Sequence, residues 1–126
     1  MTVLRIITIT ALLIFGKTTI MAQSTISDSI SAITEIIPKK GKEKDVKMAV
    51  KFIQAETSKQ TGCLLFSLSS KQDEPDTFVM FEIFKSQEAL DAHKKQAHTI
   101  RFGKLLEGKY EKNNVTFLNT INTYYH

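Results

Sequence analysis

The sequence contains a single cysteine, Cys63, and this excludes an intrachain disulfide. An unpaired cysteine is a reactive thiol, one half of an intermolecular bridge, or a small buried hydrophobic residue. Cys63 opens an apolar segment of the chain. That position favours the third of these roles.

The lysine-rich part of the chain lacks arginines, which proteins that bind nucleic acids usually combine with exposed aromatic side chains. The lysines between residues 39 and 51 gather on one loop and one predicted helix face. Without arginines or exposed aromatic rings beside them, they fit a solvated helix face better than a nucleic-acid site. We therefore expect no nucleic acid among the partners of the protein.

No segment is long enough to hold the chain permanently in a membrane. The apolar run at residues 6–15 is roughly half of the ~20 residues that a membrane-spanning helix needs. It follows Arg5 and leads into small residues, which is the layout of a secretory signal peptide at residues 1–22. We expect export to the periplasm or the extracellular medium, without a stable membrane anchor. Because Arg5 and Lys17 would leave with the signal peptide, the formal charge would fall from +4 to +2.

The remaining chain suits one folded domain, since 42% hydrophobic and 24% charged residues are ordinary for a globular protein. We expect residues 23–28 to form a loose lead-in and residues 29–126 to form the domain. The expected elements are a strand at 29–37, a helix at 43–59, strands at 63–70 and 78–84, a helix after Ser86, a short helix at 97–107 and a strand at 115–121. The first helix should carry an apolar stripe of Val46, Ala49, Val50 and Ile53, widened by Met48, Phe52 and Ala55. Gly62 should end this helix in a left-handed conformation, and Asn113 and Asn114 should form the turn before the last strand.

This order of strands and helices predicts an α+β protein with a ferredoxin-like β-α-β-β-α-β antiparallel sheet. The helices of such a fold cover one face of the sheet only. The other face carries many apolar residues in this sequence and requires a cover, so we expect a homodimer that packs sheet against sheet.

The stretch from the strand at residues 78–84 into the next helix carries the candidate chemistry. Both alternating faces of the strand are apolar except at Glu82, and a lone buried acid is costly without a use. Ser86 is a suitable helix N-cap. His93 shares a helix side with Leu90 and should face the sheet that carries Glu82. The sequence therefore predicts that an acid and an imidazole meet in an apolar place.

These residues resemble the antibiotic biosynthesis monooxygenase family, and within it the small quinol monooxygenase-like proteins. The resemblance spans residues 33–121. It is carried by Pro38, Gly41, Gly62-Cys63, Phe81-Glu82-Ile83-Phe84-Lys85-Ser86, Glu88-Ala89-Leu90, Ala92-His93 and His98. It implies a dimeric α/β barrel that binds small aromatic or hydroxylated molecules. Some members oxygenate these molecules without a metal or an organic cofactor.

The sequence departs from the family at one position. Many members have a tryptophan two residues after the glutamate, where this sequence has Phe84, and no tryptophan occurs anywhere in the chain. In haem-degrading members that tryptophan contributes to catalysis, so its absence disfavours haem degradation.

The resemblance implies a cofactor-independent monooxygenase that acts on dioxygen and a small quinol-like or hydroxylated aromatic substrate. Two alternatives stay open, a non-catalytic dimeric module that binds a small molecule and an isomerase of the same family. A third, structural role would leave Glu82 and His93 as a hydrogen-bonded pair that ties a helix to the sheet.

Oxygenation without a cofactor requires that the substrate loses a proton, so that its anion can pass an electron to dioxygen. His93 is a candidate base because the ordinary pKa of histidine is ~6.5. Glu82 would orient the imidazole or carry protons itself. The candidate substrate-binding residues are Phe66, Met80, Phe81, Phe84 and Phe102, with His98 at the rim. Nothing in the sequence fixes a metal-binding geometry for Glu82, His93 and His98, and we expect no metal site.

Overall fold

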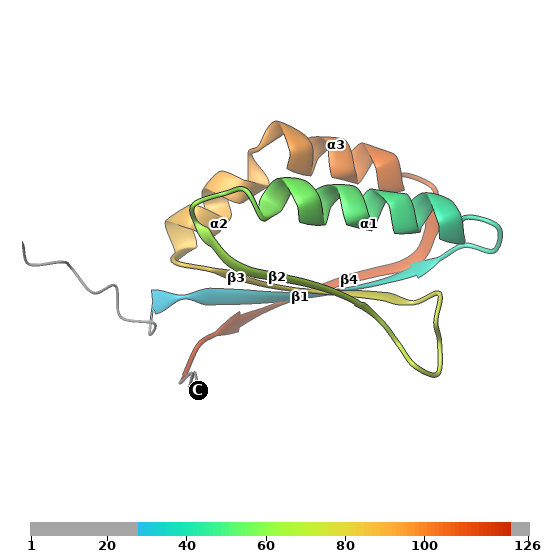
Figure 1. Cartoon of the computed structure of the whole chain (residues 1–126), viewed down its shortest axis with the longest axis horizontal. Helices are drawn as coiled ribbons and strands as arrows, with labels where there is room; N and C mark the ends of the chain where they lie inside the picture. Colours follow the sequence, from blue (N-terminus) through green and yellow to red (C-terminus); the bar gives the residue numbers. More distant parts are fainter. Residues whose placement is uncertain (1–27, 122–126) are drawn as a thin grey trace, which may run out of the picture.

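Within residues 28–121, which the computed structural model describes, four strands form one antiparallel sheet and three helices lie on one of its faces (Figure 1). The elements are β1 (Ile30–Pro38), α1 (Glu43–Thr57), β2 (Cys63–Ser70), β3 (Phe78–Phe84), α2 (Gln87–Lys94), α3 (Ala97–Leu106) and β4 (Tyr110–Asn119). The strands lie in the order β2-β3-β1-β4. The predicted ferredoxin-like fold is therefore confirmed.

The predicted signal peptide at residues 1–22 lies outside the described residues, as does most of the lead-in that follows it. Export therefore stays a prediction. Within the described part of the chain, no helix combines the length and the apolar character that a membrane span requires.

The boundary between β1 and α1 follows from three residues. Pro38 is the last residue of β1, because proline has no N–H to donate to a strand partner. Gly41 has a φ of +80° in the turn that follows, a left-handed conformation that suits glycine. Its N–H donates to Glu43 Oε1 at 2.9 Å. Glu43 also lies in the first turn of α1, where a negative charge is stabilised by the helix dipole.

Two short helices follow β3 instead of one long helix. Ser86 is the N-cap of α2, as predicted, and its Oγ accepts the backbone N–H of Ala89 at 3.2 Å. The helical conformation is then interrupted between Lys94 and Ala97. Thr99 stabilises the turn between the two helices, because its hydroxyl donates to the backbone carbonyl of His93 at 2.7 Å. The first turn of α3 is thereby tied to the last turn of α2.

The core lies between the helices and one face of the sheet. Its buried residues are Ile36, Val46, Ala49, Val50, Ile53, Phe78, Met80 and Leu106. The predicted apolar stripe of α1 is narrower than expected, because Met48 and Ala55 are exposed. One stripe of small and β-branched side chains is therefore enough to attach α1 to the sheet.

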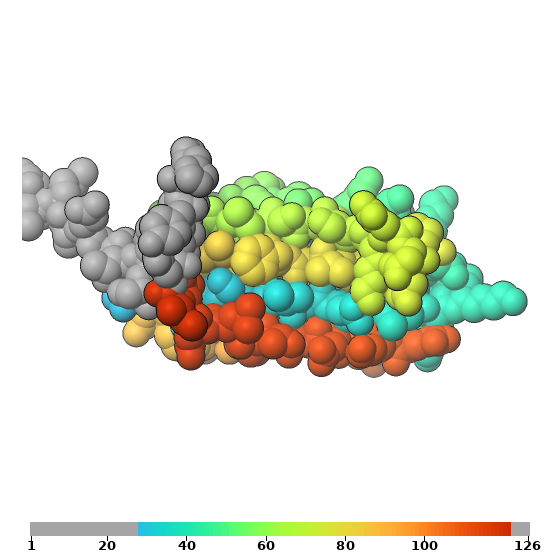
Figure 2. Space-filling view, turned by 90° about the horizontal axis from the view of Figure 1, so that it is seen from below, coloured from blue at the N-terminus to red at the C-terminus, as the bar shows by residue number. Residues whose placement is uncertain are grey.

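The opposite face of the sheet carries no helix among the described residues, and apolar side chains lie on it beside the ion pairs of Glu35 (Figure 1). Figure 2 looks onto this face, where the four strands lie side by side. Ile33, Leu65 and Leu118 are 37%, 40% and 41% exposed there. The registers also place Phe81 and Ile83 on this face.

The last strand begins earlier than predicted. The turn expected at Asn113 and Asn114 is wrong, since both residues lie within β4 and pair with Ile36 and Glu35 of β1. β4 is an edge strand, and the two asparagines are exposed. Pairing with β1 therefore outweighs the turn preference of asparagine.

Gly62 has a different role from the one that the sequence predicted. We expected it to end the first helix in a left-handed conformation, but α1 ends at Thr57, and among the described glycines only Gly41 and Gly108 have a positive φ. A Cβ atom at position 62 would lie 2.8 Å from the Cβ of Ala89. The loop after α1 thus approaches α2 so closely that only glycine fits there.

Replacing this glycine tests the close approach. We expect Gly62→Ala to lower the free energy of unfolding by about 1–3 kcal/mol, because the added methyl group forces the loop away from α2. Gly103→Ala is the matched control, because a Cβ atom added at this position would have no neighbouring atom within 4 Å. Alanine in place of glycine in a helix interior should raise the free energy of unfolding by about 0.5–1 kcal/mol. The measurement is the urea midpoint of each variant. Equal midpoints for Gly62→Ala and the wild type would contradict the packing.

Candidate functional site

Glu82 lies on the face of β3 that packs against the helices. The strand buries every second side chain, and this alternation places the carboxyl group between Met80 and Phe84. Glu82 is 7% exposed. Among the described residues, no hydrogen bond or ion pair reaches its carboxylate. Because burial disfavours the charged form, the pKa of Glu82 is raised to about 7.

Glu82 lines a cavity of about 160 Å³ between the sheet and the helices. The other residues that line this space, the Glu82 cavity, are Ala32, Thr34, Ile53, Met80, Leu90, His93, Lys94, Thr99, Phe102, Asn113, Val115 and Phe117. A dry apolar cavity of about 150 Å³ holds one benzene ring, so the volume of the Glu82 cavity is that of a single aromatic ring.

The Glu82 cavity opens toward the edge strand β4. Val115 and Phe117 line it, yet they are 46% and 51% exposed, whereas Glu82 and His93 are buried. Lys94 lies at the same opening, with its Nζ 4.9 Å from the centre of the Phe117 ring. The entrance therefore combines an aromatic ring with a cation, and the acid lies at the buried end.

His93 is buried on α2 and holds its ring in a defined place. Its Nδ1 lies 2.8 Å from Oε1 of Gln60, and its ring centre lies 4.9 Å from that of Phe84. The pKa of His93 is lowered to about 4, first by burial and then by the charges of His98 and Lys94. The imidazole is therefore neutral at pH 7.

Glu82 and His93 line the same cavity, as the sequence predicted from the strand and helix patterns. Among the described residues no hydrogen bond joins them, as a purely structural pair would require, and Nδ1 of His93 is bound to Gln60. The two ionisable groups are therefore both available to a molecule in the cavity.

The structure brings only some of the predicted pocket residues to this place. Met80 and Phe102 line the Glu82 cavity. Phe66 packs against the core, and Phe84 lies behind His93 with its ring against the imidazole. His98 does not line the cavity, and its ring centre lies 5.9 Å from that of His93.

Phe81 points to the other face of the sheet, because it follows Met80 and precedes Glu82 in a strand whose side chains alternate. It lines a groove on that face together with Leu118. Phe81 therefore does not belong to the Glu82 cavity.

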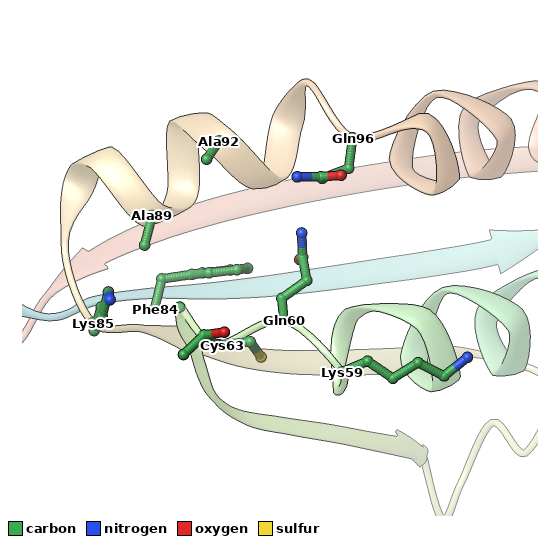
Figure 3. Close-up of a pocket in the computed structure, with 10 residues that line it drawn as sticks. Lys59, Gln60, Cys63, Phe84, Lys85, Ala89, Ala92 and Gln96 are labelled. Atoms are coloured by element: carbon green, nitrogen blue, oxygen red, sulfur yellow. The ribbon is translucent and has the colours of Figure 1, made fainter.

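A second and larger cavity, of about 400 Å³, lies between α2 and the loop that follows α1 (Figure 3). We call it the Cys63 cleft, and its lining includes Gln60, Cys63, Phe84 and Gln96. The cleft and the Glu82 cavity meet at His93, because Gln60 and Phe84 line the cleft and both contact that ring.

Cys63 itself is half-buried, and its thiol donates to the backbone carbonyl of Leu65 at 3.4 Å. Burial and then the charge of Glu82 raise the pKa of Cys63. The neutral thiol is therefore favoured over the thiolate.

Sequence reasoning missed Gln60, Lys94 and Thr99. Gln60 lies 33 residues before its partner His93 and in a loop, so no helical or strand period connects the two. Lys94 has the sequence context of an ordinary exposed lysine. Thr99 reaches His93 only because the helix is interrupted between α2 and α3, which the sequence does not reveal. A separation of six positions between His93 and Thr99 carries no signal by itself.

Among residues 28–121, no group of three or more histidine, cysteine, aspartate or glutamate side chains is arranged to hold a metal ion. The polar groups that line the Glu82 cavity are one carboxyl, one imidazole, the hydroxyl groups of Thr34 and Thr99, the Lys94 ammonium and the Asn113 amide. This set suits proton transfer and hydrogen bonding to a hydroxylated molecule.

The unpaired carboxyl should make stability depend on pH. A raised carboxyl pKa means that the folded protein holds a proton that the unfolded chain releases, so stability falls as the pH rises from 4.5 to about 7. The Glu82→Gln variant should not show this loss of stability, because glutamine does not ionise. We expect the variant to gain about 3 kcal/mol relative to the wild type between pH 4.5 and pH 8, from a pKa difference of roughly 2.5 units.

The measurement is urea denaturation of both proteins across this pH range. The comparison cancels groups that titrate in both proteins, including His93, whose lowered pKa costs stability as the pH falls below 6.5. A difference that stays constant from pH 4.5 to pH 8 would show that the carboxyl group of Glu82 is not desolvated.

Known structures share this fold. A protein of Pseudomonas aeruginosa superposes with a TM-score of 0.72 at 20% sequence identity, over 78% of this chain and 99% of that one. A protein of Mycobacterium tuberculosis gives 0.73 at 20% identity, over 76% and 98%. A solved structure described as an antibiotic biosynthesis monooxygenase gives 0.68 at 21% identity, over 74% and 99%. No curated protein matches the sequence.

Residues 29–104 match the family described as antibiotic biosynthesis monooxygenase. This segment contains β1, β3 and α2, and with them both Glu82 and His93. Because the match covers more than half of the chain, the protein belongs to the antibiotic biosynthesis monooxygenase family.

Proposed function

We propose that the protein is a cofactor-independent monooxygenase that acts on a small hydroxylated aromatic molecule, such as a quinol, in the Glu82 cavity. The observation that carries this proposal is the buried carboxyl of Glu82, which has no partner among the described residues and faces a space the size of one ring. Membership of the family supports oxygenation as the reaction class.

Glu82 is the base in this proposal. With a pKa of about 7 it is half ionised at neutral pH, and a base is most effective when its pKa lies near the working pH. His93, the base expected from the sequence, has a pKa of about 4 and is a weak proton acceptor. We assign it a hydrogen bond to a substrate hydroxyl instead.

The reaction follows from the chemistry of the substrate. Glu82 takes the proton of one hydroxyl group, and the resulting anion passes an electron to dioxygen. The two radicals combine to form a carbon–oxygen bond, and cleavage of the oxygen–oxygen bond leaves one oxygen atom on the ring. The other oxygen leaves as water with two hydrogen atoms from the substrate. All electrons that reduce dioxygen come from the substrate, so the reaction requires no further reductant.

The entrance of the cavity favours substrates that carry a second polar group. A ring that reaches the Glu82 carboxyl would direct its opposite edge toward Lys94 and Phe117. The Lys94 ammonium is suited to a phenolate or a carboxylate at that edge. We therefore expect hydroquinones and acidic phenols to bind better than unsubstituted phenol.

Oxygen consumption tests the function. Purified protein is mixed with a panel of hydroquinones and catechols, and the uptake of dioxygen is compared with the spontaneous rate. We expect Glu82→Gln to lower the enzymatic rate by about 100-fold or more, because the base is lost. The wild-type rate should rise with pH through a midpoint of about 7, as the carboxyl ionises.

The matched control is Asp73→Asn, which removes an exposed carboxylate from the turn between β2 and β3. It should keep the wild-type rate. If every protein matches the spontaneous rate, the oxygenase proposal fails for this panel. Saturable binding without turnover would then identify a binding module, and conversion of a ligand without oxygen uptake would identify an isomerase.

We also propose that a second copy of the chain covers the bare face of the sheet. Ile33 on the inner strand β1 and Leu65 and Leu118 on the edge strands β2 and β4 expose apolar surface on this face, which is costly to leave in water. An antiparallel sheet with helices on one face is commonly completed in this way by a two-fold symmetric partner.

Sedimentation measures this association. We expect the wild type to have about twice the mass of one chain, and Ile33→Glu to have the mass of one chain, because a charge in the centre of the interface is not solvated. The control is Met48→Glu, which places the same charge on a 57% exposed residue of α1. A monomeric wild type would rule out the dimer.

A further inference from the structure

The ring of His93 meets two hydrogen-bond acceptors at the same nitrogen. Oε1 of Gln60 lies 2.8 Å from Nδ1, and Oγ1 of Thr99 lies 3.5 Å from it. The amide oxygen of Gln60 can only accept. The hydroxyl of Thr99 donates its proton to the backbone carbonyl of His93 at 2.7 Å, so toward Nδ1 it also accepts.

These contacts determine which nitrogen carries the proton. A neutral imidazole has one N–H, and two acceptors at Nδ1 require that it lies there. Nε2 then has a lone pair and no proton. Among the described residues, no hydrogen bond reaches Nε2 of His93, while its ring lines the Glu82 cavity.

We propose that Gln60 is a positioning residue that holds His93 in the tautomer protonated at Nδ1, so that the unprotonated Nε2 is presented to a molecule in the Glu82 cavity. The proposal rests on the proposed function only for the identity of that molecule. The tautomer itself follows from the contacts of Gln60 and Thr99.

The backbone fixes Gln60 well enough for this role. Its N–H donates to the carbonyl of Thr57 at 2.9 Å, and its carbonyl accepts the N–H of Cys63 at 3.0 Å. The carbonyl of Gly62 accepts the N–H of Lys85 at 2.9 Å, which attaches the same loop to the end of β3. The side chain of Gln60 therefore extends from a backbone that is anchored on both sides, and Figure 3 shows it directed toward α2.

The tautomer has a consequence for the choice of ligand. An unprotonated Nε2 accepts a hydrogen bond and cannot donate one, so it favours a ligand hydroxyl over a ligand carbonyl. A quinol offers hydroxyl groups, whereas the oxidised quinone offers only carbonyl oxygens at the same positions. Gln60 would thus make the site prefer the reduced substrate and release the oxidised product.

The tautomer is read directly by nitrogen-15 NMR of the imidazole rings in the whole protein at pH 7.5. We expect the wild type to show a protonated Nδ1 and an unprotonated Nε2 for His93. Gln60→Ala should lose this pattern and give a mixture of tautomers. Gln96→Ala is the matched control. The side chain of Gln96 lines the same Cys63 cleft but makes no hydrogen bond to the His93 ring among the described residues, and its backbone N–H, which donates to the His93 carbonyl at 3.1 Å, is kept in the variant.

A second variant tests the same contact if the alanine substitution disturbs the loop. Gln60→Glu keeps the acceptor and adds a negative charge, which should raise the pKa of His93 by about 1–3 units. The other titratable or charged groups near the ring are Glu82 on β3, Lys94 on α2 and His98 on α3, and all three are unchanged in this variant.

A wild-type His93 protonated at Nε2 would overturn the proposal, as would a tautomer that survives Gln60→Ala. Neither result depends on turnover. If the NMR pattern is found while no substrate is oxidised, the positioning role of Gln60 stands and the oxygenase function fails. If the protein oxidises quinols, Gln60→Ala should also lose the preference for quinol over quinone in binding, whereas Gln96→Ala should keep it.

Discussion

Glu82 occupies a position on β3 at which the alternation of the strand directs its side chain toward the helices. A carboxyl group in that layer would ordinarily have a cation or several N–H donors beside it, and this one has neither among the described residues. The cost of burying it appears as a pKa of about 7. The proposed reaction depends on this burial without a partner, because a carboxyl group that titrates at neutral pH can take a proton from a substrate and return it.

Glu82 and His93 have different proposed roles because the contacts around the two side chains differ. His93 directs one nitrogen to Gln60 and rests its ring against Phe84, so it is held as a neutral hydrogen-bonding group. The loop that carries Gln60 is pressed onto α2 at Gly62, where no larger residue fits. A packing contact remote from the cavity thus contributes to the orientation of the ring that lines it.

The strand–helix unit around Glu82 could be predicted from the sequence, since it depends on local signals: the apolar alternation of β3, the N-cap at Ser86 and the helical spacing that leads to His93. The contact between Gln60 and His93 could not, because it joins a loop to a helix through tertiary packing. A bulge between Cys63 and Leu65 likewise turns Cys63 to the helix side, opposite to the face that simple alternation predicts. The roles proposed for Glu82 and His93 also depend on the burial of each group, which no spacing in the sequence reveals.

The ionisation of Glu82 is the property on which the proposed function depends most. It is measured directly by carbon-13 NMR of the glutamate side-chain carboxyl groups across pH 3 to 9, with Glu82→Gln to assign the resonance. We expect one glutamate that titrates near pH 7 and whose signal is missing from the variant. If every glutamate of the folded protein titrates at or below pH 4.5, the carboxyl is solvated or paired, and Glu82 is not the base.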